Sequence, residues 1–479
     1  MPLTRARMLD RTFAKDPAFD RRFIVGVLST GIYCVPSCKA PKPKPENVEF
    51  FSSPEEASKS GLRACKRCFP NLAFQGLDPD ELHFENLHQE VRAKPQDFEG
   101  VEAMAKWAGV SVSRLHSGMR SYYHSTPLEV LTAARVARAG ERLIGCEAPV
   151  TSVGADAGFA STSVYYENFA RLMGMSPAMY RSLREATEFE IALPEPYPHE
   201  LLAAYLGRDD SDPILHRRGE SFCLALPGPK PNAATFEIGP GTVRVRVEGG
   251  REAIRAHALL RRMFGLNQDP RPLDNFLASD PRFSTLAADA GLRVFQTPQL
   301  FDAIAWSIVG QQLTVKFAMV LRRRLFELLD IPEVDGIYVA LEPEHVANLE
   351  PEQLLPLQYS LRKAEYLVGI ARRFLSEGVD PNALLDWPAT RVQRWLTETR
   401  GFGPWSTNYA MMRGCGYANC VPVGDTGLTS GLARIYRLER RPDPEETMKL
   451  MKPFEPYRSL ATFRIWYSRR LWEAEAVVA

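Results

Sequence analysis

Four of the eight cysteines in this sequence of 479 residues have the spacing of a metal site. Three residues separate Cys34 from Cys38, two separate Cys65 from Cys68, and 26 lie between the pairs. Two such pairs can close a tetrahedron of thiolates around one Zn²⁺ ion. Lysines and arginines flank both pairs, and cationic surroundings stabilise thiolates and attract phosphate. The spacing predicts a zinc site, which is either a structural module or a reactive thiolate centre that faces a polyanion.

The second candidate for chemistry is the carboxylate of Asp425. It lies 22 residues after Gly403, which with Gly401 brackets an apolar residue in a tight turn, and Pro404 suits the first position of a following helix. Backbone N–H groups of such a turn and helix start form an anion site suited to a DNA phosphate. The residues expected to contact DNA here are Gly401, Gly403, Ser406 and Thr407. The pattern predicts a helix-hairpin-helix, with Asp425 as either a catalytic group or an ordinary helix N-cap.

Length, composition and charge indicate the number of globular units around these two sites and where basic charge is concentrated. A chain of this size, with 45% hydrophobic residues, is expected to form about three or four globular units. The net charge is only +1, but residues 1–77 carry 13 Lys and Arg against 7 Asp and Glu, so the basic charge is concentrated around the cysteines. No apolar run approaches the length of a membrane span and no signal peptide opens the chain, which predicts a cytoplasmic protein without a membrane partner.

After a boundary at Asp78-Pro79-Asp80, the sequence predicts two helix-turn-helix units. Each unit has a helix, a glycine turn, a Ser N-cap and a second helix. The expected recognition helices lie near 113–122 and 162–171. Residues 78–187 carry 11 basic against 14 acidic side chains, and the second recognition helix contains Glu167 and Asn168. A helical spacer is therefore the alternative to a domain that reads a promoter.

The remaining chain divides into a mixed part and a helical part. A helix over 199–206, a strand with period-2 alternation over 242–247 and a helix over 253–264 predict an α+β unit with an antiparallel sheet. From Pro298 onward the apolar spacing is helical. The helices expected there cover 300–308, 313–329, 361–375 and 391–399.

The sequence around the first cysteine pair resembles that of a known family. The segment Thr30-Gly31-Ile32-Tyr33-Cys34-Val35-Pro36-Ser37-Cys38-Lys39, with residues 46–48 and 64–68, closely resembles the N-terminal domain of the bacterial adaptive-response (Ada) methyltransferases. The resemblance implies that Cys34 accepts a methyl group from an alkylated DNA phosphotriester, with Cys38, Cys65 and Cys68 as its fellow Zn²⁺ ligands. Four thiolates on Zn²⁺ carry a net charge of about −2, and methylation would remove one negative charge, which would strengthen DNA binding.

A second resemblance covers the helix-turn-helix units. The second unit resembles the AraC-type DNA-binding domain at Gly158-Phe159, Tyr165-Tyr166, Phe169, Gly174, Ser176-Pro177 and Tyr180-Arg181. This resemblance implies promoter DNA and RNA polymerase as partners. His124 departs from the type, because the first unit usually has Gly at that position.

The C-terminal part resembles 3-methyladenine DNA glycosylase II (AlkA) of the helix-hairpin-helix superfamily. The resemblance is carried by the hairpin, Asp425, residues 308–313 and residues 464–467. The resemblance makes Asp425 the catalytic carboxylate and Gln312 the residue that fills the space left by a flipped base. It places Trp405, Tyr409 and Trp466 in the substrate pocket, with Tyr205 from the preceding unit. Without the resemblance these aromatic residues would be read as ordinary core.

The expected chemistry fits an alkylated purine. Alkylation at a ring nitrogen leaves a cationic base that departs easily, so a carboxylate needs mainly to stabilise positive charge on the deoxyribose. Electron-rich rings stack well on a cationic base. Bifunctional relatives place a Lys where this chain has Trp405, which predicts a monofunctional enzyme, and no four-cysteine iron–sulfur motif follows Asp425.

The sequence therefore predicts a multidomain DNA alkylation repair protein that acts as a monomer on alkylated double-stranded DNA. Its expected parts are a small α+β zinc methyl-acceptor domain (1–77), an all-α double helix-turn-helix domain (78–187), an α+β domain with an antiparallel sheet (188–293) and an all-α helix-hairpin-helix glycosylase domain (294–479). One alternative is a methylation-activated transcriptional regulator with a vestigial glycosylase domain. Another is a glycosylase for mismatched or oxidised bases.

Overall fold

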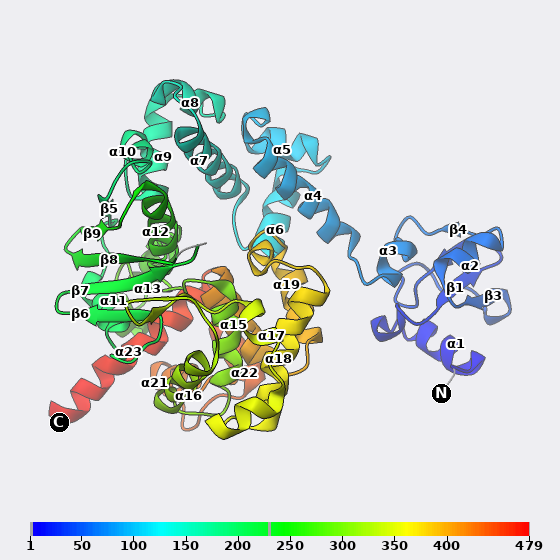
Figure 1. The fold of residues 1–479 in the computed structure, drawn as a ribbon. Coiled ribbons are helices and arrows are strands. Elements are labelled where there is room, and N and C mark those ends of the chain that lie inside the picture. Colours follow the sequence, from blue (N-terminus) through cyan, green and yellow to red (C-terminus); the bar gives the residue numbers. More distant parts are fainter. Residues whose placement is uncertain (1–2, 229–230, 479) are drawn as a thin grey trace. The chain divides into compact units, whose positions relative to one another are not determined.

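A computed structural model describes residues 3–228 and 231–478. The chain forms two compact units, Met1–His88 and Gln89–Ala479, which are described separately (Figure 1). None of the helices in these described ranges combines the length and the apolar character that crossing a membrane requires.

The first unit is built on a four-stranded sheet with the order β3-β1-β2-β4. Strand β2 pairs antiparallel with β1 and parallel with β4, and β1 pairs antiparallel with β3. Gly26 of β1 is required there, because a Cβ atom would lie 2.5 Å from the ring of Phe51. The elements are α1 (Arg5–Phe13), β1 (Ile24–Val27), β2 (Ile32–Cys34), β3 (Val48–Phe51), α2 (Pro54–Lys59), β4 (Arg63–Ala64) and α3 (Pro70–Phe74).

Seven helices follow, and they contain the two expected helix-turn-helix units, α5–α6 and α8–α9. Ser111 and Ser161 cap the second helix of each unit, since their side chains accept hydrogen bonds from the N–H groups of Arg114 and Val164. The helices are α4 (Pro79–Ala93), α5 (Val101–Trp107), α6 (Val112–Tyr123), α7 (Pro127–Gly145), α8 (Val150–Asp156), α9 (Thr162–Met173) and α10 (Pro177–Ser182). The long helix α7, which begins in a capping box of Thr126 and Glu129, was not expected from the sequence.

The mixed part has an antiparallel sheet of five strands with the order β5-β9-β8-β7-β6. Val243 and Val245 of β9 are buried while Arg244 and Arg246 are exposed, as the alternating pattern predicts. Helix α12 packs against this sheet (Figure 1). The elements are β5 (Glu188–Ala192), α11 (His199–Leu206), β6 (Leu215–Arg218), β7 (Ser221–Leu226), β8 (Asn232–Gly239), β9 (Thr242–Arg246) and α12 (Gly250–Met263).

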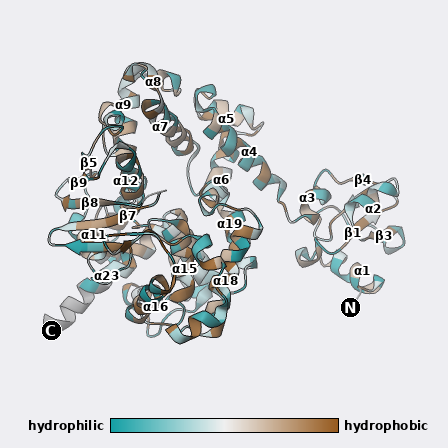
Figure 2. Cartoon of the chain, viewed as in Figure 1, coloured by the Kyte–Doolittle hydropathy of each residue, from teal (hydrophilic) through white to brown (hydrophobic). Residues whose placement is uncertain are grey.

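The rest of the described chain is helical apart from a short pair of strands, β10 (Glu333–Val334) and β11 (Ile337–Tyr338). The α-helices are α13 (Arg271–Ser279), α14 (Ser284–Ala287), α15 (Leu300–Val309), α16 (Val315–Leu328), α17 (Pro343–Ala347), α18 (Leu361–Ser376), α19 (Ala389–Glu398), α20 (Pro404–Ala410), α21 (Thr426–Ile435), α22 (Pro444–Met451) and α23 (Arg458–Val478). Hydrophobic residues gather along α15 and β7, and both contribute to one continuous core (Figure 2). The expected fold class is confirmed: a zinc domain, a helix-turn-helix region, an antiparallel sheet and a helical hairpin domain.

Candidate zinc and catalytic sites

The first unit brings the four predicted cysteines together. Their sulfur atoms all lie within 4.8 Å of one another, with Cys34, Cys38 and Cys65 buried and Cys68 half-buried. The parallel pairing of β2 with β4 creates this cluster, because Cys34 ends β2 and Cys65 directly follows β4.

The donor chemistry of the cluster fits Zn²⁺. All four cysteines are free thiols, and tetrahedral coordination by four sulfurs is typical of structural zinc. The neighbouring thiols of Cys38 and Cys68, and then burial, raise the pKa of the Cys34 thiol. Keeping all four side chains as thiolates at these short distances therefore requires a divalent cation between them. This agrees with the zinc site that the spacing predicts.

Two side chains outside the cluster hold the loop between Cys34 and Cys38. Asp20 accepts a hydrogen bond from the Ser37 N–H at 2.8 Å and another from the Ser37 hydroxyl. Lys42 donates to the carbonyl oxygen of Pro36 at 3.0 Å. Asp20 carries no sequence signal for this role, because no local pattern links it to a residue 17 positions later.

The second unit brings Asp425 to the two predicted tryptophans. One carboxylate oxygen, Oδ1, accepts from Trp466 Nε1 at 2.8 Å, and the other, Oδ2, accepts from Trp405 Nε1 at 3.0 Å. Asp425 is also the N-cap of α21, since Oδ1 accepts from the Leu428 N–H at 2.8 Å. The N-cap interpretation is therefore correct, and it does not exclude a role in a site.

Three of the four predicted pocket residues form one aromatic cluster. Trp405 and Tyr409 of α20 are stacked, with ring centroids 5.4 Å apart and planes at 27°. The ring of Trp466 from α23 lies 6.2 Å from that of Tyr409. Tyr409 is buried, whereas both tryptophans are half-buried and can be reached from solvent.

Tyr205 of α11 joins this cluster through an arginine. The buried guanidinium of Arg413 lies over the rings of Tyr205 and Tyr409, at 5.3 and 5.8 Å from their centroids, and it also donates to the Tyr205 hydroxyl. A second guanidinium, that of Arg208, lies 3.7 Å from the Tyr205 centroid. Burial alone would raise the pKa of Tyr205, but Arg208 and Arg413 outweigh it and lower that pKa.

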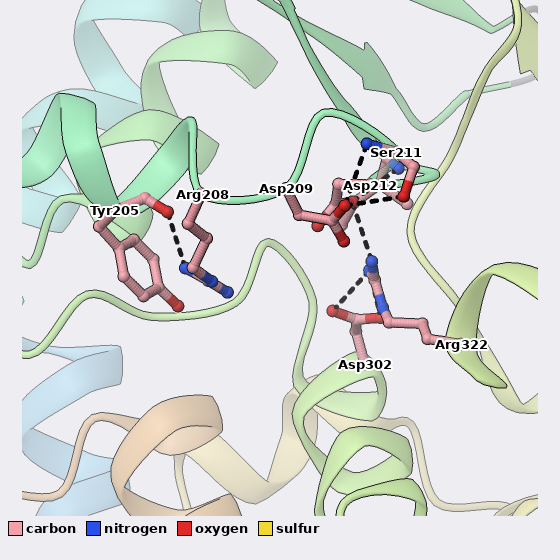
Figure 3. A network of polar contacts seen from close by, with 8 residues as sticks. Tyr205, Arg208, Asp209, Ser211, Asp212, Asp302 and Arg322 are labelled. Atoms are coloured by element: carbon pink, nitrogen blue, oxygen red, sulfur yellow. Dashed lines mark hydrogen bonds and ion pairs between the residues drawn. The ribbon is translucent and has the colours of Figure 1, made fainter. Parts of the chain in front are cut away.

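A cavity of about 70 Å³ adjoins this group and shares Tyr205, Arg208, Tyr409 and Arg413 with it. Part of the cavity lining is an ion-pair network in which Arg322 contacts Asp212 at 2.9 Å and Asp302 at 3.1 Å (Figure 3). Burial raises the pKa of Asp302, and Arg322 opposes that shift. Asp212 and Asp302 are thus paired with Arg322, and the guanidinium of Arg208 lies beside the Tyr205 ring (Figure 3).

The two glycines of the hairpin between α19 and α20 have different surroundings. Gly401 has a φ of +99°, and a Cβ atom there would lie 2.4 Å from the ring of Tyr366. At Gly403 a Cβ atom would meet nothing within 4 Å, which leaves the backbone open to approach from outside. The side chains of Ser406 and Thr407 are buried, so the predicted DNA contacts of these two residues could come only from their backbone.

The loop between α15 and α16 contains two glutamines with different surroundings. Gln312, the predicted space-filling residue, is exposed and has a φ of +55°. Gln311 donates to the Gly401 carbonyl and to the Ser406 hydroxyl, both at 2.9 Å. Gln311 thus connects this loop to the hairpin, a role without a local sequence signal because its partners lie at least 90 residues away.

Comparison with protein families matches three separate parts of the chain. Residues 7–71 match the metal binding domain of Ada, and residues 104–182 match a helix-turn-helix domain. Residues 305–456 match the HhH-GPD superfamily of base excision DNA repair proteins. The matched parts contain the cysteine cluster, the helix-turn-helix units and the hairpin with Asp425, in that order.

Individual relatives support the same division. The chain is 31% identical over 207 residues to a DNA-3-methyladenine glycosylase of Bacillus subtilis, which covers 42% of this chain and 68% of the relative. It is 26% identical over 478 residues to a probable bifunctional transcriptional activator/DNA repair enzyme AlkA of Mycobacterium tuberculosis, with 95% and 94% of the two chains covered.

A solved structure shows the fold of the C-terminal part. The 3-methyladenine DNA glycosylase from Archaeoglobus fulgidus superposes with a TM-score of 0.53 at 21% identity, covering 59% of this chain and 98% of that one. The chain therefore belongs to the DNA-3-methyladenine glycosylase family, as a fusion of an Ada zinc domain, an AraC-type helix-turn-helix region and an HhH-GPD glycosylase domain like the bifunctional AlkA proteins of Mycobacterium.

Proposed function

We propose that this DNA glycosylase releases alkylated purines of the 3-methyladenine type from double-stranded DNA, with Asp425 as the catalytic carboxylate. The observation that carries the proposal is the position of that carboxylate between the indole N–H groups of Trp405 and Trp466, at 3.0 and 2.8 Å. A flipped base that stacks on the aromatic cluster would bring its sugar close to Asp425.

The proposed reaction divides the work among three groups. Gln312 occupies the space that the flipped nucleotide leaves in the duplex, and backbone N–H groups at the start of α20 hold a DNA phosphate. The rings of Trp405, Tyr409 and Trp466 bind the cationic base. Asp425 stabilises the positive charge that develops on the deoxyribose and orients the attacking water.

The proposed product is an abasic site with both strands intact. Strand cleavage by a glycosylase requires an amine that forms a Schiff base with the sugar. This chain has Trp405 at the hairpin position where bifunctional relatives carry that amine. Borohydride should therefore trap no covalent protein–DNA adduct.

The zinc domain is proposed to repair a different lesion by a single turnover. The Cys34 sulfur would attack the methyl carbon of a phosphotriester, forming an S–C bond while the C–O bond breaks and the phosphate oxygen keeps the electron pair. Bound Zn²⁺ would keep Cys34 in its thiolate form. The resulting thioether carries one negative charge fewer, which favours DNA binding.

A second function, promoter recognition after methylation, is supported by the exposed face of α6. Arg114, Ser117 and Arg120 lie on that face, as a recognition helix in a major groove requires. The intact arrangement around Asp425 favours an active glycosylase over a regulator with a vestigial one.

The test of the enzymatic proposal is base release by wild-type protein and by Asp425→Asn. Asparagine keeps the shape and the N-cap but removes the charge, so the variant should bind methylated duplex DNA and release no measurable methylated purine. Release near the wild-type rate would contradict the assignment of Asp425.

A further inference from the structure

The loop that leads from Tyr417 to Asp425 is fixed by side chains from three elements. The Cys420 N–H donates to the Ser459 hydroxyl of α23 at 2.9 Å. The Val421 N–H donates to the Asn408 amide oxygen of α20 at 3.2 Å. Helices α20 and α23 also carry the tryptophans that bind Asp425, so these two bonds connect the loop to the aromatic cluster.

The third fixing residue comes from the DNA-binding region. The Asn419 N–H donates to Nδ1 of His124 at 3.2 Å, across 295 residues of sequence. The His124 ring lies 5.4 Å from that of buried Tyr417 in an edge-on arrangement. His124 is the C-cap of α6, which packs against α19 of the glycosylase domain (Figure 1).

Further contacts join the helix-turn-helix region to the glycosylase domain near His124. Arg92 of α4 forms an ion pair with Asp386, in the segment that leads into α19. The Tyr417 hydroxyl donates to the carbonyl of Trp387 at 2.6 Å, and Arg458 donates to the Asn419 side-chain oxygen at 2.7 Å. Tyr417 therefore connects the loop to the segment before α19, and Asn419 connects the loop to His124 and to Arg458 of α23.

His124 occupies a backbone position that suits glycine. Its φ is +54°, and the equivalent C-cap of the second helix-turn-helix unit is Gly174, with a φ of +68°. A residue with a Cβ is strained in this left-handed region. The strain at His124 is offset by a contact that glycine could not make.

The ring of His124 is suited to accept a hydrogen bond. Burial, and then the charge of Arg458, lowers its pKa to about 4, so the ring is neutral at pH 7. In a neutral imidazole one nitrogen accepts while the other carries the proton. The bond from Asn419 therefore requires the tautomer with its proton on Nε2.

We propose that His124 is a positioning residue for base excision: the DNA-binding region holds, through the Nδ1 acceptor, the loop that places Asp425. This inference rests on the proposed role of Asp425. It makes the helix-turn-helix region part of the support of the catalytic site, in addition to any role in binding DNA.

The test uses full-length protein with two substitutions at this position. His124→Phe keeps a ring against Tyr417 and removes the acceptor. His124→Asn keeps an acceptor near Nδ1 and tolerates positive φ. His216→Phe, on strand β6 and away from this loop, is the matched control, and Asp425→Asn gives the rate without catalysis.

The measurements are single-turnover base release on saturating methylated duplex and DNA affinity. His124→Phe should release bases at least about fivefold more slowly, because small displacements of a catalytic group are sufficient for such losses. Its DNA affinity should change by less than about twofold, and His124→Asn and His216→Phe should stay within about twofold of wild type. A wild-type rate for His124→Phe, or an equally slow His124→Asn, would overturn the inference.

Amide hydrogen exchange over 417–425 supplies a readout that does not depend on catalysis. His124→Phe should exchange faster there than wild type, while His124→Asn and His216→Phe should not. Protection unchanged in His124→Phe would also overturn the inference. If wild type released bases no faster than Asp425→Asn, the proposed function would fail, and the exchange result would still decide whether His124 fixes the loop.

Discussion

Asp425 shows how one carboxylate can cap a helix and also accept hydrogen bonds from the two indoles of a candidate site. Its Oδ1 atom accepts both the Leu428 N–H and the Trp466 indole, while Oδ2 accepts the Trp405 indole. The N-cap bond fixes the side chain relative to α21, and the indoles fix it relative to α20 and α23. Such fixation from several elements is what a catalytic group needs to stay aligned with a reacting atom.

The indole bonds lead to a prediction about the tryptophans. Trp405→Phe and Trp466→Phe each keep an aromatic face but remove a donor to Asp425, so each should slow single-turnover base release by about tenfold or more. Trp395→Phe is the matched control, because Trp395 donates to Glu377 at 2.6 Å, outside the site. An unchanged rate in both site variants would show that the indoles serve only as packing.

A second residue-scale prediction concerns charge in the pocket. The guanidinium of Arg208 lies 3.7 Å from the Tyr205 centroid, where a cationic base would otherwise find an aromatic face. Arg208→Met should therefore raise the release of cationic methylated purines relative to neutral hypoxanthine, by about threefold or more. Arg217→Met removes a comparable cation from Phe222, on the sheet, and should leave that ratio unchanged. An unaltered ratio in Arg208→Met would exclude this role of Arg208.

At the scale of elements, the two hairpin glycines should respond differently to alanine. Gly401→Ala places a Cβ against Tyr366 at a φ of +99° and should lower the free energy of unfolding by roughly 1–3 kcal/mol. Gly403→Ala meets no atom within 4 Å and should leave stability nearly unchanged, but it should weaken DNA binding by obstructing backbone contact with a phosphate. Thermal unfolding and DNA titration measure both effects; equal stability losses would contradict this division.

The helices for which the sequence predicts bounds lie close to observed ones, because apolar spacing and caps are local signals. The expected helix over 199–206 coincides with α11, and that over 361–375 with α18 to within a residue. Helix α7 was missed, although its Thr126–Glu129 capping box was available as a signal. Only one strand of the five-stranded sheet was specified, since strand pairing depends on distant partners.

The candidate sites were predictable to a similar extent. Family motifs predict roles for Cys34, Asp425 and the aromatic residues as candidates, and the structure brings Asp425 together with Trp405 and Trp466. The supporting contacts of Gln311 and His124 join residues 90 and 295 positions apart, and no local pattern encodes them. In the sequence, His124 stands out only as an exception to the expected glycine.

At the scale of the whole molecule, the two compact units lead to a prediction about communication. Methylation of Cys34 should strengthen DNA binding in a salt-dependent way, because it changes charge near phosphates rather than contacts with bases. It should not change single-turnover base release on saturating DNA, because Cys34 and Asp425 lie in separate units. A methylated protein with an altered release rate would show that the units are coupled.

The central claim is that one chain repairs two kinds of alkylation damage at two independent sites. Its most direct test is to incubate wild type, Asp425→Asn and Cys34→Ser with duplex DNA that carries labelled methyl groups, and to follow released bases and labelled protein together. Wild type should release labelled purines and acquire label on the peptide with Cys34. Asp425→Asn should lose only the release, and Cys34→Ser only the protein label. Label on another cysteine, or purine release that survives in Asp425→Asn, would contradict the account.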